Sequence, residues 1–285
     1  MADGVFVGLA TIDLIYTVES LPPPNSKAVA QSQELFVGGP ATNAAITFSQ
    51  LGSTAALVTS AGQHGLASII KDELAHYSIE LVELTPDNDG LPAISSVWVD
   101  RQGRRSVVSV NTTRLSNRSP RVDVRILANA RILLVDGHSM EACRAWARAA
   151  RSSGVPVVLD GGSWKTGSED LLEFVDIAIC SADFLPPDCS REDDVIQYLQ
   201  RHSVKHIAIT HGADPIRFLS GSSEGTIAVP QVDVVDTTGA GDVLHGAFCY
   251  YSVAGHAFAD SLREAAKVAS ESCRYAGTRR WMQRD

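Results

Sequence analysis

The sequence predicts an α/β protein of three layers, with helices on both faces of a mostly parallel central sheet and a small second sheet beside it. Two observations predict this fold. After residue 130, apolar strand-like runs alternate with helices of roughly 10–15 residues, the pattern of parallel βαβ units. Residues 13–37 and 93–112 interrupt that alternation with extended runs, and we expect them to pair as a β-sheet lid. The α/β core then comprises residues 1–12, 38–92 and 113–285.

The first half of the chain is expected to contribute strands to both sheets. VFVGLATIDLIYTV is expected to form a buried strand, a glycine break and a second strand, followed by a turn at LPPPNS. GGPATNAAITFSQLG indicates a loop and a helix, because Pro40 suits a first helical turn. AALVTSAG is a strand, LASIIKDELAHYS an amphipathic helix, and AISSVWVDRQGRRSVVSV a hairpin turning near Gln102.

The second half alternates strand and helix with short connections. ARILLVDG, VPVVLDGG, the end of DLLEFVDIAICSA and HIAITHG are expected strands. MEACRAWARAARSSG, DDVIQYLQRHS, DVLHGAFCYYSVAG and DSLREAAKVASESCRYAG are expected helices. Parallel strands joined in this way take right-handed crossovers and place their carboxyl ends at one edge of the sheet.

Composition and charge exclude several classes of protein. The net charge of −9 argues against a general nucleic-acid binder. No apolar run approaches the roughly 18 residues that cross a bilayer, so no membrane partner is expected. The five cysteines are scattered and odd in number, which favours reduced thiols in the cytoplasm over a disulfide framework. The N-terminus carries no basic region typical of a secretory signal.

The segment TTGAGD lies between a strand-like apolar run and a helix. Backbone N–H groups at such a helix start attract anions, and small side chains leave room for a phosphate oxygen. Asp242 then enters the first turn, where it could accept a proton from a hydroxyl. A structural alternative is that the glycines form a turn and Asp242 caps the helix.

Three stretches together resemble one family. DTTGAGD at 236–242, GGPATNAA at 38–45 and GLATIDLIY at 8–16 are similar to the signatures of the ribokinase-like (PfkB) carbohydrate kinases, in the same order and spacing. The resemblance covers essentially the whole chain and implies a ribokinase-like α/β/α domain. It also implies transfer of the γ-phosphoryl group of ATP to a primary hydroxyl of a sugar.

The resemblance assigns roles to individual residues. Asp242 matches the catalytic base, and Gly239, Ala240 and Gly241 match the anion hole that stabilises the transferring phosphoryl group. The positions matched to sugar binding are Asp13, Gly38, Gly39 and Asn43. The positions matched to ATP binding are Ser181, Thr210, Gly212, Thr237, Ala266, Ser270 and Cys273. Caps or core positions are the structural alternatives for Asp13, Asn43 and the last three.

The family pattern is not complete. Asn-x-x-Glu, which helps to organise Mg²⁺ in the family, is replaced by Ser181-Ala182-Asp183-Phe184, so the resemblance implies Mg²⁺ but assigns it no ligands. A monovalent cation such as K⁺ is left open. Gly161-Gly162-Ser163-Trp164 stands where the family often has Asn and Arg.

The substrate expected is a ketohexose-type sugar, with 6-deoxy-6-sulfofructose as the leading member. Several local stretches resemble the sulfofructose-kinase and ketohexokinase branch, and Lys27 could face an anionic substituent. The residues that could complete that site are Arg104, Arg105, Asn111 and His138, for each of which surface charge or polarity is the alternative. A ribokinase, fructokinase or nucleoside kinase stays open, as does a non-catalytic sugar or nucleotide sensor. Pairing of two lids would cover their sheet edges, so a homodimer is expected.

Overall fold

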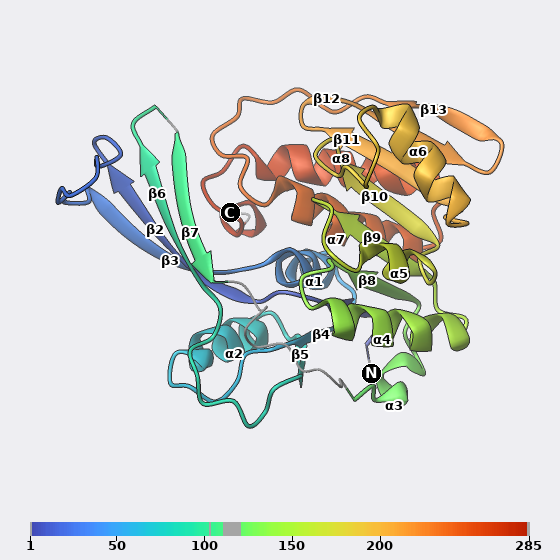
Figure 1. Ribbon diagram of the computed structural model, residues 1–285, viewed down its shortest axis with the longest axis horizontal. Helices are drawn as coiled ribbons and strands as arrows, with labels where there is room; N and C mark the ends of the chain where they lie inside the picture. The colour runs from blue at the N-terminus through green and yellow to red at the C-terminus, as the bar shows by residue number, and fades with distance from the viewer. Residues whose placement is uncertain (1, 103, 111–120, 284–285) are drawn as a thin grey trace.

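The computed structural model describes residues 2–102, 104–110 and 121–283. A central sheet separates two layers of helices, and a second sheet projects from its edge (Figure 1). The central sheet has nine strands in the order β13-β12-β11-β10-β9-β8-β1-β4-β5. Their bounds are β1 Gly4–Val7, β4 Ala55–Thr59, β5 Glu80–Glu83, β8 Ile132–Val135, β9 Val157–Gly161, β10 Ile177–Ser181, β11 His206–His211, β12 Asp214–Ser220 and β13 Ser223–Ile227.

The strands from β5 to β11 are parallel, and they consist largely of buried residues. Val5 of β1 lies between Ala56 of β4 and Leu133 of β8 in register. Strands covered on both faces need apolar residues at every position, as in ILLV of β8. β12 and β13 pair antiparallel at one edge. All parallel strands therefore end at the same side of the sheet, where the loops that carry polar side chains gather.

The two helical layers bury separate apolar clusters against the two faces of the sheet. Phe6, Leu57 and Leu134 point to one face, and Val5, Val58 and Leu133 point to the other. The first layer contains α1 Pro40–Gln50, α2 Ala67–His76, α7 Ala240–Val253, α8 Phe258–Ser272 and the short helix η2 Arg280–Met282. The second layer contains α3 Val124–Leu127, α4 Met140–Ser152, α5 Ser168–Leu172 and α6 Glu192–Arg201.

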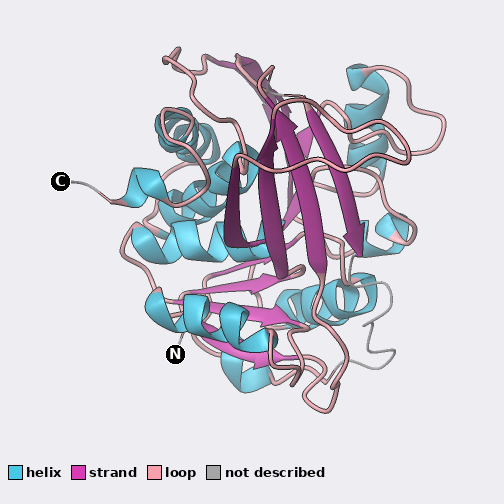
Figure 2. Ribbon diagram, turned by 90° about the vertical axis from the view of Figure 1, so that its left-hand side faces the viewer, coloured by secondary structure: helices cyan, strands magenta, loops and turns pink. Residues whose placement is uncertain are grey.

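The second sheet has four strands in the order β3-β2-β6-β7 and faces the viewer in Figure 2. Their bounds are β2 Thr11–Val18, β3 Ser32–Gly38, β6 Ile94–Asp100 and β7 Arg105–Val110. Only residues 8–10 separate β1 from β2, so the chain passes directly from one sheet into the other. The start of β2 and the end of β3 therefore lie next to the carboxyl edge of the central sheet.

The three-layer architecture and the small second sheet are confirmed, and the central sheet has three strands that the sequence patterns do not predict. β5 and the β12–β13 hairpin fall in segments with no strong period-2 pattern. The division of the chain into a core and a lid at residues 13 and 37 stays a prediction. Among the described residues, no helix has the length and apolar character needed to cross a membrane.

Candidate active site

The start of α7 is the centre of the site. Gly239 adopts a left-handed conformation (φ 70°), and a Cβ atom there would lie 2.5 Å from Thr278 Cγ2, so only glycine fits. Gly241 is exposed, and a Cβ atom there would meet no atom within 4 Å. The Ala240 N–H donates to the Thr237 carbonyl oxygen at 3.2 Å, and the space in front of Gly241 is open, as an anion site at a helix start requires.

Asp242 enters this turn and is held from the neighbouring helix. Its Oδ2 accepts a hydrogen bond of 2.6 Å from Asn43 Nδ2 of α1. The two helices approach closely because Gly246 has no side chain, and a Cβ atom there would lie 2.3 Å from the Ala44 carbonyl oxygen. One small residue, a helical turn beyond Asp242, therefore brings together two side chains 199 positions apart.

The surroundings of Asp242 favour proton uptake. Burial raises the pKa of Asp242 to about 7, and the nearby carboxylates of Asp160 and Asp136 add to the rise. The Asn43 hydrogen bond and the charge of His245 oppose it. A carboxylate with a pKa near neutrality is suited to accept a proton from a reacting hydroxyl.

A cavity of about 160 Å³ opens on one side of Asp242. Asn43 Oδ1 is buried there without a hydrogen-bond partner, so it can accept a bond from a ligand hydroxyl. Burial raises the pKa of Asp13, which hydrogen bonds from Ser95 and Thr11 partly counteract. The cavity is lined by Asp13, Ile15, Phe36, Val37, Gly38, Gly39, Pro40, Asn43, Thr238, Gly239, Asp242, Gly277 and Thr278.

The two glycines at the end of β3 make room for this cavity. A Cβ atom on Gly38 would lie 2.0 Å from Asp13 Oδ2, so the strand can run against that carboxylate only as glycine. Gly39 has φ 104°, and its Cβ would lie 2.1 Å from the Leu9 carbonyl oxygen. Pro40 then begins α1 with its fixed φ. The motif therefore places Asp13 and Asn43 on the same cavity.

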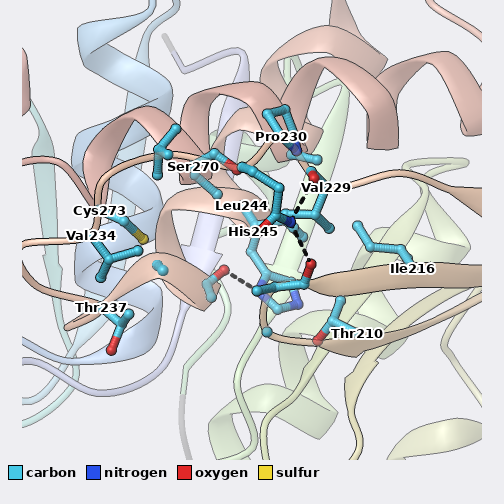
Figure 3. A pocket seen from close by; sticks show the side chains of 18 residues that line it. Thr210, Ile216, Val229, Pro230, Val234, Thr237, Leu244, His245, Ser270 and Cys273 are labelled. Atoms are coloured by element: carbon cyan, nitrogen blue, oxygen red, sulfur yellow. Dashed lines mark hydrogen bonds between the residues drawn. The ribbon is translucent and has the colours of Figure 1, made fainter.

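A second cavity of about 320 Å³ opens on the other side of the α7 start (Figure 3). It is mostly apolar, and the residues that the resemblance matches to ATP gather in it: Thr210, Gly212, Thr237, Ala266, Ser270 and Cys273. The sequence analysis misses Ile216, Val229, Pro230, Val234 and Leu244, which also line it. The apolar residues of AVPQVDVV, in a segment with no helical or strand period, are the signal that could have indicated Val229, Pro230 and Val234.

A single helical turn thus borders both cavities. Thr238, Gly239 and Asp242 line the smaller cavity, and Thr237, Ala240 and Gly241 line the larger one. Groups bound in the two cavities would therefore meet at this turn. The arrangement can therefore place an acceptor hydroxyl at Asp242 and an anion at the exposed helix start.

Asp236 connects the same turn to the second sheet. Its Oδ1 accepts bonds from Thr238 N and Thr238 Oγ1, and its Oδ2 accepts one from Gly277 N. Arg105 of β7 also reaches Oδ1, at 2.9 Å. Although burial opposes it, these partners keep the pKa of Asp236 below its usual value. Arg105 therefore contacts the signature segment rather than open solvent alone.

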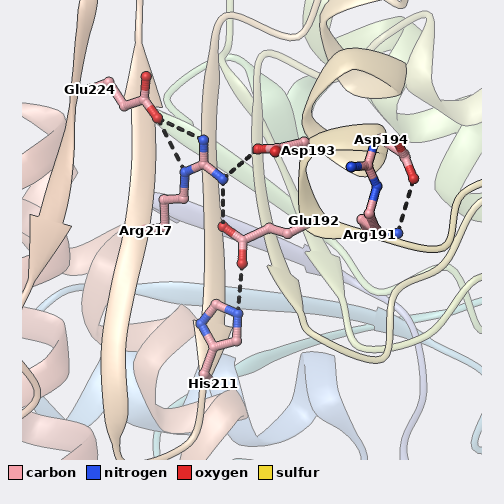
Figure 4. Close-up of polar contacts among 7 residues, drawn as sticks. All are labelled: Arg191, Glu192, Asp193, Asp194, His211, Arg217 and Glu224. Carbon is pink, nitrogen blue, oxygen red and sulfur yellow. Dashed lines mark hydrogen bonds and ion pairs between the residues drawn. The ribbon is translucent and has the colours of Figure 1, made fainter.

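Another network anchors the rim of the larger cavity (Figure 4). His211, between Thr210 and Gly212, lies 2.9 Å from Glu192 at the start of α6. Glu192 also binds Arg217 of β12. These contacts connect the end of β11, with Thr210 and Gly212 on either side of His211, to the start of α6.

The residues for Mg²⁺ are not evident in the fold. Among the described residues, no group of three or more histidine, cysteine, aspartate or glutamate side chains could hold a metal ion. Phe184, at the position of the family's glutamate, is buried against Trp164. Nothing in the described part of the chain therefore assigns ligands to Mg²⁺.

Several predicted residues lie apart from both cavities. Lys27 is exposed in the connection between β2 and β3, and Arg104 pairs with Asp100 in the β6–β7 turn. His138 follows β8, and its backbone N–H donates to Asp136 Oδ1. Ser181 ends β10 and bonds to Asp183 N. None of these four lines either cavity, and Asn111 lies outside the described residues.

Comparisons with known proteins agree with a phosphotransferase built on this fold. The model of the pfkB family of carbohydrate kinases matches residues 1–284. The chain therefore belongs to the pfkB family, and it is a carbohydrate kinase, a phosphotransferase with a hydroxyl acceptor.

Relatives of known name share about a quarter of the residues. Ribokinase of Arabidopsis thaliana is 25% identical, covering 93% of this chain and 74% of the relative. ATP-dependent ribose-1-phosphate kinase of Halopiger xanaduensis is 26% identical, over 83% and 80%. Fructokinase-1 of Zea mays is 25% identical, over 85% and 80%.

Solved structures share the fold. Ribokinase from Arabidopsis thaliana, complexed with ribose and ATP, superposes with a TM-score of 0.83, covering 97% of this chain and 94% of the other at 24% identity. Ribokinase from Thermotoga maritima superposes with a TM-score of 0.84, over 98% and 95% at 19% identity.

Proposed function

We propose that this kinase transfers the γ-phosphoryl group of ATP to a primary hydroxyl of a small sugar, with Asp242 as the base. The observation that carries the proposal is the turn at the start of α7, which borders both cavities. The sugar is held in the smaller cavity by Asp13 and Asn43, and the adenine side of ATP enters the larger, apolar cavity.

The reaction divides between the two sides of that turn. Asp242 takes the proton of the acceptor hydroxyl, whose oxygen then attacks the γ-phosphorus in line with the departing ADP. The Gly241 N–H, at the open start of the helix, stabilises the charge on the transferring oxygens. When bound with ATP, Mg²⁺ supplies charge neutralisation between the phosphates.

The sugar is proposed to be a ketohexose or a pentose of similar size. The printed names of the relatives include ribokinases and fructokinases, and a cavity of about 160 Å³ suits one sugar ring. The 6-deoxy-6-sulfofructose expectation stays a prediction. The sulfonate group of that sugar is an anion that a lysine or arginine side chain would bind. Among the described residues that line the smaller cavity, none is lysine or arginine.

The test is ADP release from MgATP against ribose, fructose, fructose 6-phosphate, 6-deoxy-6-sulfofructose and a nucleoside, in potassium and tetramethylammonium buffers. We expect turnover with one furanose-forming sugar, and the phosphorylated carbon is identified by ¹H–³¹P coupling in the product. Comparison of the two buffers tests the K⁺ expectation. Binding of ATP and a sugar without ADP release would contradict the proposal and favour a sensor.

A further inference from the structure

His245 lies one turn after Gly241 in α7 and is buried, with 5% of its surface exposed. Its Nδ1 is 2.7 Å from the Gly241 carbonyl oxygen, and its Nε2 is 3.0 Å from the Ile179 carbonyl oxygen. Carbonyl oxygens only accept hydrogen bonds, whereas a neutral imidazole carries a single N–H. A neutral ring would therefore set a lone pair against a lone pair at one of these contacts, and a doubly protonated ring satisfies both.

The counter-ion for such a ring is present. Asp160, at the end of β9, places Oδ2 3.5 Å from His245 Nδ1. That oxygen is buried and has no hydrogen-bond partner, and both side chains are 7% exposed. A buried carboxylate without partners is costly unless a cation faces it. Burial raises the pKa of Asp160, and the charge of His245 opposes that rise.

Asp242 lies beside this pair. It precedes His245 by three positions, which places both side chains on one face of the helix. Other groups face the same region: Asn43 bonds to Asp242, and Asp136, His138 and Lys165 lie around Asp160. All of them except Asn43 are ionisable. The charge of Asp160 raises the pKa of Asp242, and the charge of His245 lowers it.

We propose that His245 is a buried imidazolium paired with the Asp160 carboxylate, and that this ion pair sets how readily Asp242 takes the proton of the acceptor hydroxyl. The proposal rests on the role of Asp242 as the base. His245 touches neither reacting atom in this scheme, so it is a positioning residue. Its cation favours the ionised carboxylate of Asp242, while Asp160 favours the protonated form.

The test compares two neutral replacements by the pH profile of kcat/KM. His245→Gln removes the positive charge and is expected to move the acidic limb upward, by about half a pH unit or more. Asp160→Asn removes the negative charge and is expected to move the limb downward by a similar amount. His256→Gln, an exposed histidine just beyond the same helix, is the matched control and should leave the limb in place. Shifts of both variants in the same direction, or no shift in active variants, would overturn the proposal.

A second measurement does not depend on the variants folding. In ¹⁵N-histidine-labelled native protein, both ring nitrogens of His245 should give protonated shifts between about pH 6 and 8, with the signal assigned by its loss in His245→Gln. A neutral ring in that range would overturn the proposal even if the enzyme is active. Turnover retained by Asp242→Asn would instead refute the role of Asp242 as the base, and the charge state of His245 would still be read from the spectrum.

Discussion

Two glycines of the anion hole, both at the start of α7, differ in backbone conformation and in the space around them. Gly239 needs a positive φ and has Thr278 against it, whereas Gly241 is helical and open to solvent. Replacement by alanine is therefore expected to change the stability of the fold differently at the two positions.

Gly239→Ala is expected to lower the free energy of unfolding by about 1–2 kcal/mol or more, because of the left-handed backbone and the contact with Thr278. Gly241→Ala is expected to leave it unchanged or to raise it by up to about 1 kcal/mol. Both should lower kcat by about 10-fold or more, since the methyl group disturbs the phosphate position. Urea unfolding and steady-state kinetics check this, and full activity of Gly241→Ala would argue against a phosphate at that position.

Asp242 should also make stability depend on pH. Its pKa is higher in the folded chain than in the unfolded chain, so the folded state binds more protons between about pH 4 and 7. Its contribution to stability is therefore fully present below pH 4 and is lost as the pH rises to about 7.

Asp242→Asn removes that loss and is expected to raise the free energy of unfolding at pH 8 by about 1–2 kcal/mol relative to the native chain, with a smaller difference at pH 4.5. Urea titrations at both pH values measure the two differences. An equal effect at pH 4.5 and pH 8 would show that ionisation of Asp242 is not the cause.

At the scale of elements, the second sheet is tied to the signature segment through Arg105 and Asp236. The ion pair is partly exposed, so its contribution to stability is small. Asp236 matters more because it also accepts three bonds that shape the turn before the anion hole.

Arg105→Ala is therefore expected to lower kcat/KM by a few-fold with little change in Tm. Asp236→Ala is expected to lower both kcat/KM and Tm more strongly, because Thr238 and Gly277 lose a half-buried acceptor. Arg101→Ala is the control, since Arg101 pairs with Glu19 in the same sheet with both side chains exposed. Kinetics equal to those of Arg101→Ala would contradict a role for the Arg105 contact.

Sequence patterns predict the elements better than they predict the site. The alternation of strands and helices indicates the parallel strands, because strands buried on both faces have continuous apolar runs such as ILLV. β12 and β13 lie at an edge, and their mixed residues carry no such signal. The contact between Asn43 and Asp242 joins residues 199 apart, so only family resemblance indicates it. The buried contacts of His245 depend on the Ile179 carbonyl, which no spacing rule can predict.

At the scale of the whole molecule, the second sheet has exposed apolar side chains and two edge strands that pair with no further strand among the described residues. Leu35, Val107, Val108 and Val110 are 46–73% exposed, and β3 and β7 are the edge strands. Exposed edges of this kind favour pairing with another sheet. The homodimer expected from the sequence stays a prediction, and this sheet is the surface on which it depends.

Sedimentation velocity tests the dimer directly. The native chain is expected to sediment as a dimer, and Val108→Glu to shift it toward monomer, because a charge is costly in a covered apolar interface. Val124→Glu, at an exposed position of α3, is the matched control. A native chain that sediments as a monomer would contradict the expectation.

The proposed reaction depends most on Asp242 as the base between the two cavities. The most direct measurement is single-turnover phosphoryl transfer by Asp242→Asn, with the affinities for ATP and sugar measured on the same protein and exposed Asp87→Asn as the control. If Asp242 is the base, the rate is expected to fall by about 10²–10⁴-fold while both ligands bind nearly as before. Transfer by Asp242→Asn at a rate within a few-fold of Asp87→Asn would contradict it.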